Sequence, residues 1–201
     1  MPTTVHNFTS LGYAAPMGCG FMDKDEFLER FCLDEEDRHK RAERISKGMV
    51  RYERRKNAIF TFKDSVAKID LCEVCRHPKG VTYTLCEVVP SFDGVDVGEM
   101  LLQVREKAEV FCKSEGTRGQ CLINIVIPPE PKMIMELGEH LDEMTRLGNF
   151  AVTVYDTKSG KMGMLVIDES FLSELREDPD YEGMSDAEIF TNFMMNYAEL
   201  L

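Results

Sequence analysis

The sequence predicts an α+β fold, and three observations support this. Hydrophobic residues make up 43% of the 201 residues, enough to build a core. Segments with the composition of strands come in two pairs, each joined by a turn-like segment. Helical segments lie between and around these pairs. This order predicts a mostly antiparallel sheet of about five strands with two helices packed on one face, an N-terminal helical segment and a C-terminal helix.

The chain before the sheet is expected to have two parts. Residues 1–22 contain Gly12, Pro16, Gly18 and Gly20, and we interpret them as an ordered arm. Residues 23–57 are expected to be a charged helical segment. One helix begins at Asp23, which has Glu26 three residues on, as in a capping box, and a second helix begins at Asp34. Acidic residues open this second helix and basic residues close it, the order that the helix dipole favours.

Residues 58–201 are expected to form the α+β core and to fold as one unit with the rest. The predicted elements are strands at 68–74 and 81–89 around the turn 75–80, a helix at 97–114, a buried central strand at 121–127, a helix at 132–147, a hairpin of strands 150–155 and 161–167, a short helix at 170–176, and a final helix that follows a capping box beginning at Ser185. No glycine-rich turn of the Rossmann or P-loop type accompanies these elements.

Charge is distributed unevenly along the chain. The net charge is −12, but residues 38–56 hold nine basic and two acidic side chains, a net charge of +7, which leaves −19 elsewhere. An anionic protein is not expected to bind nucleic acid, except through Arg38–Lys56, and no apolar run is long enough to cross a membrane. We expect a protein partner or self-association through charged residues, namely Arg51, Arg54, Arg55, Glu177, Asp178, Asp180 and Glu182.

Cysteine usage indicates a reducing compartment, and a cytoplasmic location is expected. Seven scattered cysteines are a poor disulfide framework. Cys72, Cys75 and His77 have a spacing that could form half of a zinc site, with Cys86 on the partner strand as a further ligand. The alternative is that these are strand cysteines and an exposed turn histidine. No other cofactor is expected, and a redox role for Cys72 and Cys75 is disfavoured because they do not begin a helix.

No catalytic residue is predicted. The histidines (His6, His39, His77 and His140) are expected to be exposed, and none lies beside a nucleophile. The acidic runs 34–37 and 177–182 are interpreted as a helix start and a solvated loop. The sequence therefore favours a non-enzymatic interaction protein that presents acidic surface to a basic macromolecule, as inhibitors, immunity proteins and nucleic-acid mimics do. The alternatives are a homo-oligomeric enzyme or ligand binder with an unfamiliar site, and a small zinc-containing module.

Overall fold

The predicted α+β class is confirmed in the computed structural model, which describes residues 22–117 and 121–201. The arm 1–22 therefore lies almost wholly outside the described residues. A six-stranded sheet has the strand order β1-β2-β3-β4-β5-β6. Its strands are β1 (Arg51–Phe62), β2 (Ser65–His77), β3 (Gly80–Val88), β4 (Cys121–Ile127), β5 (Phe150–Asp156) and β6 (Lys161–Ile167). The helices are α1 (Lys24–Ile45), α2 (Val97–Glu115), α3 (Pro131–Gly138), α4 (Leu141–Leu147), α5 (Glu169–Arg176), the 3-10 turn η1 (Pro179–Tyr181) and α6 (Asp186–Glu199).

The sheet is mixed. The pairs β1–β2, β2–β3 and β5–β6 are antiparallel, whereas β3–β4 and β4–β5 are parallel. Each parallel pair needs a crossover, and these crossovers contain α2 and the pair α3 and α4. Strand β4 is central, and its neighbouring side chains Ile125 and Val126 are fully buried in the core layers on opposite faces of the sheet. The prediction of a buried central strand at 121–127 is confirmed.

The predicted charged helices at 23–57 are wrong in part. One continuous helix, α1, is capped by Asp23 and extends past Asp34 to Ile45. The chain then turns at Lys47 and Gly48, which both have positive φ, and residues 51–62 form β1. Strand β1 is an edge strand in which Ala58 and Phe60 alone are buried, and an edge strand tolerates many charged side chains. The sheet therefore has a sixth strand.

Two local boundaries also differ from the prediction. The helix expected at 132–147 is two helices, α3 and α4, which are separated at Glu139 and His140. Strand β2 extends into the expected turn 75–80 and ends at His77, so that the β2–β3 turn is tighter than predicted. The hairpin of β5 and β6 and the Ser185–Glu188 capping box at α6 are confirmed.

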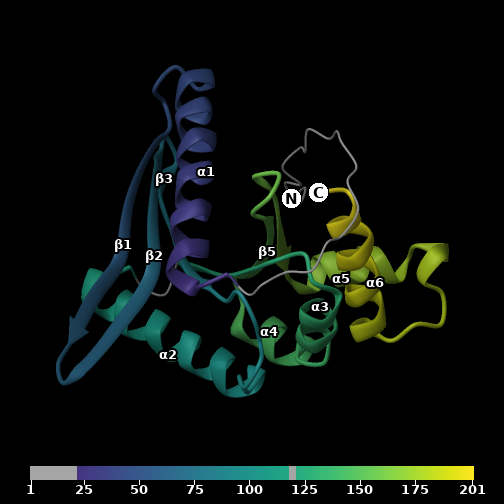
Figure 1. The fold of residues 1–201 in the computed structure, drawn as a ribbon. Helices are drawn as coiled ribbons and strands as arrows, with labels where there is room; N and C mark the ends of the chain where they lie inside the picture. The colour runs from purple at the N-terminus through teal and green to yellow at the C-terminus, as the bar shows by residue number, and fades with distance from the viewer. Residues whose placement is uncertain (1–21, 118–120) are drawn as a thin grey trace.

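Helices cover both faces of the sheet (Figure 1). Helix α1 lies along one face, where Phe27, Leu28 and Phe31 form a small core with Tyr155 of β5. Helix α2 crosses the other face, and the larger core there also includes side chains of α3, α4, α5 and α6. Within the described part of the chain, no helix is long and apolar enough to traverse a bilayer.

Candidate functional site

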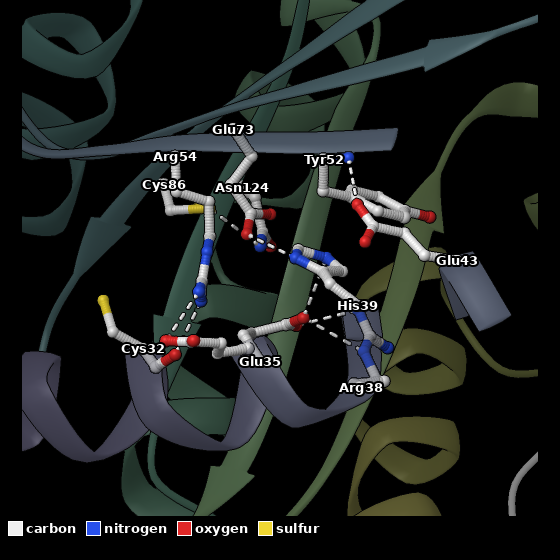
Figure 2. A network of polar contacts seen from close by, with 11 residues as sticks. Cys32, Glu35, Arg38, His39, Glu43, Tyr52, Arg54, Glu73, Cys86 and Asn124 are labelled. Carbon is white, nitrogen blue, oxygen red and sulfur yellow. Dashed lines mark hydrogen bonds and ion pairs between the residues drawn. The ribbon is translucent and has the colours of Figure 1, made fainter. Parts of the chain in front are cut away.

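A cluster of three polar side chains lies between α1 and β2 (Figure 2). Phe27, Phe31, Glu35 and His39 follow one another at four-residue spacing, so that all four lie on the buried face of α1. His39 Nε2 is 3.2 Å from Glu35 Oε2, and His39 Nδ1 is 3.7 Å from Oε1 of Glu73 on β2. We call Glu35, His39 and Glu73 the α1–β2 cluster. His39 is 7% exposed, so the expectation of an exposed histidine is wrong for this residue.

Neighbouring side chains hold the cluster in place. The Tyr52 ring stacks on the His39 imidazole at 3.8 Å between centroids, with the planes 4° apart. Arg38 contacts both carboxylate oxygens of Glu35. Its Nε donates a hydrogen bond to Oε2 at 3.0 Å, and its Nη2 is 2.8 Å from Oε1. Arg54 of β1 donates to the Cys32 carbonyl at 2.6 Å. The imidazole and one carboxylate are therefore fixed in orientation.

Burial shifts the protonation equilibria of the α1–β2 cluster. Loss of solvent, followed by the negative charge of Glu35, raises the pKa of Glu73 to about 8. Burial also raises the pKa of Glu35, against the opposing effect of Arg38. Burial, together with the positive charges of Arg38 and Arg54, lowers the pKa of His39 to about 3. At neutral pH the imidazole is therefore uncharged and Glu73 carries a proton.

Two atoms of the cluster are buried without a hydrogen bond to any described residue, namely His39 Nδ1 and Glu73 Oε1. This contrasts with a polar network next to them. Thr153 Oγ1 donates to Asn124 Oδ1 at 3.0 Å, and Asn124 Nδ2 lies 3.6 Å from Cys86 Sγ. Buried polar atoms in proteins are almost always hydrogen-bonded, so the two atoms without a partner call for an explanation.

A second polar cluster lies where the β2–β3 ladder ends. Lys24 Nζ at the start of α1 is 2.7 Å from Asp70 Oδ2 of β2, and Lys107 Nζ of α2 is 2.8 Å from Glu87 Oε1 of β3. The Val88 N–H also donates to Asp70 Oδ2 at 2.8 Å. We call Lys24, Asp70, Glu87 and Lys107 the strand-end cluster. Both carboxylates are largely buried, whereas both lysines are partly exposed.

Glu87 lies at the carboxyl end of β3, which is parallel to β4, and open α/β sheets bind ligands at the carboxyl ends of parallel strands. Burial, followed by the negative charge of Asp70, raises the pKa of Glu87 to about 7, although Lys107 opposes this shift. The segments that follow β3 and β4 line a hollow of about 140 Å³ whose walls include Phe92, Asp93 and Met133. The same end of the sheet therefore combines two close carboxylates, two ammonium groups and a concave surface.

The structure does not direct the predicted zinc ligands toward one point. Cys72 and Cys75 are three residues apart in a continuous strand, and such residues face opposite sides of a sheet. Cys72 packs in the core on the α2 side and Cys86 in the core on the α1 side. His77 lies at the far end of β2 and accepts a hydrogen bond from the Lys79 N–H at its Nδ1. Among the described residues, the α1–β2 cluster is the group with metal-ligand spacing.

The charged residues predicted to bind a partner do not pair with one another. Arg54 contacts Glu36, and Arg55 contacts Glu115 at 3.9 Å. Arg51 is exposed at the start of β1. The acidic residues of the predicted set lie around η1, are largely exposed, and form no salt bridge with a described residue; they are Glu177, Asp178, Asp180 and Glu182. The basic segment is therefore neutralised mainly by acids of α1 and α2.

The sequence analysis predicted no functional role for any member of the two clusters. The signal for Glu35 and His39 was their four-residue spacing behind Phe27 and Phe31. The signal for Asp70 and Glu73 was a charged residue within an otherwise apolar strand. Neither signal identifies the partner on another element, and Lys24 and Lys107 carried no local signal.

Comparisons with known proteins add little to this description. No protein-family profile matches the chain, and no curated protein matches it. Among solved structures, an XisH family protein from Nostoc punctiforme PCC 73102 is similar, with a TM-score of 0.46 and 7% sequence identity over 70% of this chain and 98% of that chain. A likeness at this level carries no inference about function.

Proposed function

We propose that the protein is a divalent-cation-dependent hydrolase of phosphodiesters and that the strand-end cluster is its active site. One observation carries the proposal. Two buried carboxylates, Asp70 and Glu87, lie directly beyond the last residue pair of the β2–β3 ladder. The negative charge of Asp70 raises the pKa of Glu87, and each carboxylate contacts a partly exposed lysine from a helix. This differs from the sequence-based expectation of a non-enzymatic protein, which rested on finding no catalytic pattern along the chain.

The charges of the strand-end cluster favour a cation together with an anionic substrate. Two carboxylates and two ammonium groups balance to zero. Mg²⁺ or Mn²⁺ bound by Asp70 and Glu87 would release Lys24 and Lys107 from their carboxylates and leave about two positive charges over the site. Mg²⁺ is usually held by one or two carboxylates plus substrate phosphate oxygens. A phosphate ester would then neutralise the excess charge.

The reaction assigned to this site is an in-line displacement. A water molecule attacks phosphorus, the bond from phosphorus to the leaving oxygen breaks, and a phosphomonoester and an alcohol are formed. The cation stabilises charge on the phosphoryl oxygens. Lys107, released from Glu87, is placed to stabilise the same developing charge, and Lys24 to orient the substrate.

A nucleic-acid strand is the phosphodiester that the surrounding charge favours. Lys68 is exposed on β2 two residues before Asp70, and Arg55 is exposed on the edge strand β1 opposite Cys72, two residues after Asp70. Together with the two lysines of the cluster, these side chains could contact several phosphates along a strand. The remaining negative surface would restrict binding to this side of the molecule.

The test is hydrolysis of single-stranded DNA, double-stranded DNA, RNA and bis-p-nitrophenyl phosphate with Mg²⁺ or Mn²⁺. We expect cleavage of at least one substrate and no cleavage with EDTA. In Asp70→Asn and Glu87→Gln the cleavage rate should fall by more than the roughly 10- to 100-fold that removal of a residue behind a metal ligand causes. Lys107→Ala should lower the rate with less effect on metal affinity.

Glu109→Gln is the matched control, because Glu109 is an exposed carboxylate on α2 that lies two residues from Lys107 and pairs with Lys113. It should cleave at the wild-type rate. Cleavage that persists in Asp70→Asn and Glu87→Gln would belong to a contaminant and would contradict the proposal. Folded wild-type protein that hydrolyses no substrate with either metal would contradict it as well.

An acidic interaction surface is the second candidate function. The observation that favours it is the exposed group Glu177, Asp178, Asp180 and Glu182, which has no salt bridge to the described residues. Carboxylates left in water can steer a basic partner. A polyarginine peptide should bind the wild type in low salt and bind the variant with all four acids replaced by amides several-fold more weakly. Equal binding by the two proteins would contradict this candidate.

A further inference from the structure

We propose that Glu35, His39 and Glu73 form a binding site for one divalent transition-metal ion, of which Zn²⁺ is the first to test. This site is separate from the strand-end cluster and does not depend on the hydrolase proposal. Its ligands come from α1 and β2, so that a bound ion would tie the helix to the sheet (Figure 2).

The spacing of the three side chains fits one ion. One ligand atom can be chosen from each so that all lie within 4.8 Å of one another. His39 Nδ1 and Glu73 Oε1 are 3.7 Å apart. Two ligands at roughly 2.1 Å from a tetrahedral zinc ion are about 3.4 Å apart, so this pair needs to close by only a few tenths of an ångström. Glu35 Oε2 contacts the other ring nitrogen, Nε2, so the Glu35 carboxylate would have to rotate away from Arg38 to reach the same ion.

The two atoms without a hydrogen bond indicate that the site takes a ligand. His39 Nδ1 and Glu73 Oε1 face each other, are buried, and have no hydrogen-bond partner among the described residues. Their side chains are 9% and 11% exposed, so bulk water does not serve them. Leaving such an atom unsatisfied costs about 1–3 kcal/mol. A single cation between the two atoms would satisfy both.

The ligand chemistry selects a transition metal over Mg²⁺ or Ca²⁺. An imidazole nitrogen with two carboxylates is a common donor set for zinc and related first-row metals. Ca²⁺ requires six to eight oxygens, and Mg²⁺ keeps several waters, whereas this site offers an imidazole and two carboxylates on largely buried side chains. Binding of a metal ion would displace the proton that Glu73 carries at neutral pH, and the two carboxylates would then match the charge of a dication.

The surroundings of the cluster resemble those of a metal site in their supporting contacts. The Tyr52 ring fixes the plane of the imidazole by stacking, and Arg38 holds the Glu35 carboxylate through both oxygens. Such outer contacts orient ligands before a metal arrives. The stacking of Tyr52 also restricts rotation of the His39 ring, so that Nδ1 stays directed toward Glu73.

The experiment uses the full chain, stripped of metal with a chelator and then dialysed. Isothermal titration with Zn²⁺ should give one high-affinity site per chain, and Co²⁺ should give visible absorption bands with a fixed 1:1 end point. The thermal midpoint should rise with Zn²⁺ concentration, because an ion that binds only the folded state stabilises it. Asp70→Asn should leave the affinity of this high-affinity Zn²⁺ site unchanged, which separates it from the strand-end cluster.

Variants then locate the ion. His39→Gln and Glu73→Gln should lower Zn²⁺ affinity at least tenfold, whereas Glu36→Gln should not, because Glu36 lies on the same helix but is partly exposed and pairs with Lys40. Wild-type protein that binds no Zn²⁺ or Co²⁺ at millimolar concentration overturns the proposal, whether or not the variants fold. Tight 1:1 binding that survives in folded His39→Gln and Glu73→Gln also overturns it.

Discussion

The hydroxyl of Tyr155 in β5 donates a hydrogen bond to Asp34 Oδ2 of α1 at 2.5 Å, across 121 residues of sequence. The same ring makes edge-on contacts with Phe27 and Phe31 at 5.4 Å between centroids. Tyr155 therefore joins α1 to the sheet through both its ring and its hydroxyl. Burial, followed by the hydrogen bond to Asp34, raises the pKa of Tyr155.

Tyr155→Phe should reduce the free energy of unfolding by about 1.5–3 kcal/mol, the usual contribution of a hydrogen bond to a charged group. The ring contacts remain, so the loss isolates the hydroxyl. Chemical denaturation of Tyr155→Phe, Asp34→Ala and the double variant measures the coupling. Additive losses in the double variant would show that the two groups do not interact.

Glu73→Gln should change how stability depends on pH in metal-free protein. Glu73 has a folded-state pKa of about 8 against an ordinary value of 4.5, so between these values the folded state holds a proton that the unfolded state has released. Stability from this group therefore falls as pH rises from about 4.5 to 8, by at most about 1.4 kcal/mol per pH unit. Glu73→Gln should remove this fall.

The pH prediction is measured by urea denaturation at several pH values with EDTA present. Glu36→Gln serves as the control, since contacts with Lys40 and Arg54 lower the pKa of the Glu36 carboxyl, the opposite direction. Parallel stability curves for the wild type and Glu73→Gln would contradict the prediction.

Gly163→Ala should destabilise the contact between β6 and α6. A Cβ at Gly163 would lie 2.2 Å from both the Cε1 atom and the hydroxyl oxygen of Tyr197, a distance that requires the Tyr197 side chain or the strand to move. Overpacking of this kind costs about 1–3 kcal/mol. Thermal unfolding should show the loss in the wild-type background and a smaller loss in a Tyr197→Leu background. An equal loss in both would place the strain elsewhere.

The described cysteines should alkylate in two groups. Burial raises the pKa of Cys32 and of Cys72 to about 11, raises that of Cys86 well above its usual value, and raises that of Cys121 to about 12. Thiols that are buried and protonated react slowly. Cys75 and Cys112 are partly exposed and should be modified first by iodoacetamide near pH 8, as mapped by mass spectrometry. Early modification of Cys86 would indicate local opening of the core.

The sequence by itself determined the elements whose signals are local. Ser185 and Glu188 lie three residues apart and form the predicted capping box, and the apolar run Cys121–Ile127 is the predicted central strand. Gly116 ends α2 in the left-handed conformation, close to the predicted end. These features depend on hydrogen bonds and periodicities within a few residues, so one stretch of chain contains all the information needed.

Tertiary structure decided the identity of β1 and both polar clusters. Residues 51–57 belong to the predicted charged helical segment, but pairing of β1 with β2 satisfies their backbone groups, and their position at the sheet edge leaves the charged side chains in water. The environment of Glu73 is set by His39 on a helix more than thirty residues earlier, and that of Glu87 by Lys107 on a later helix. A carboxylate is functional or merely solvated according to what other elements place beside it, because burial and neighbouring charge set its protonation and its ligands.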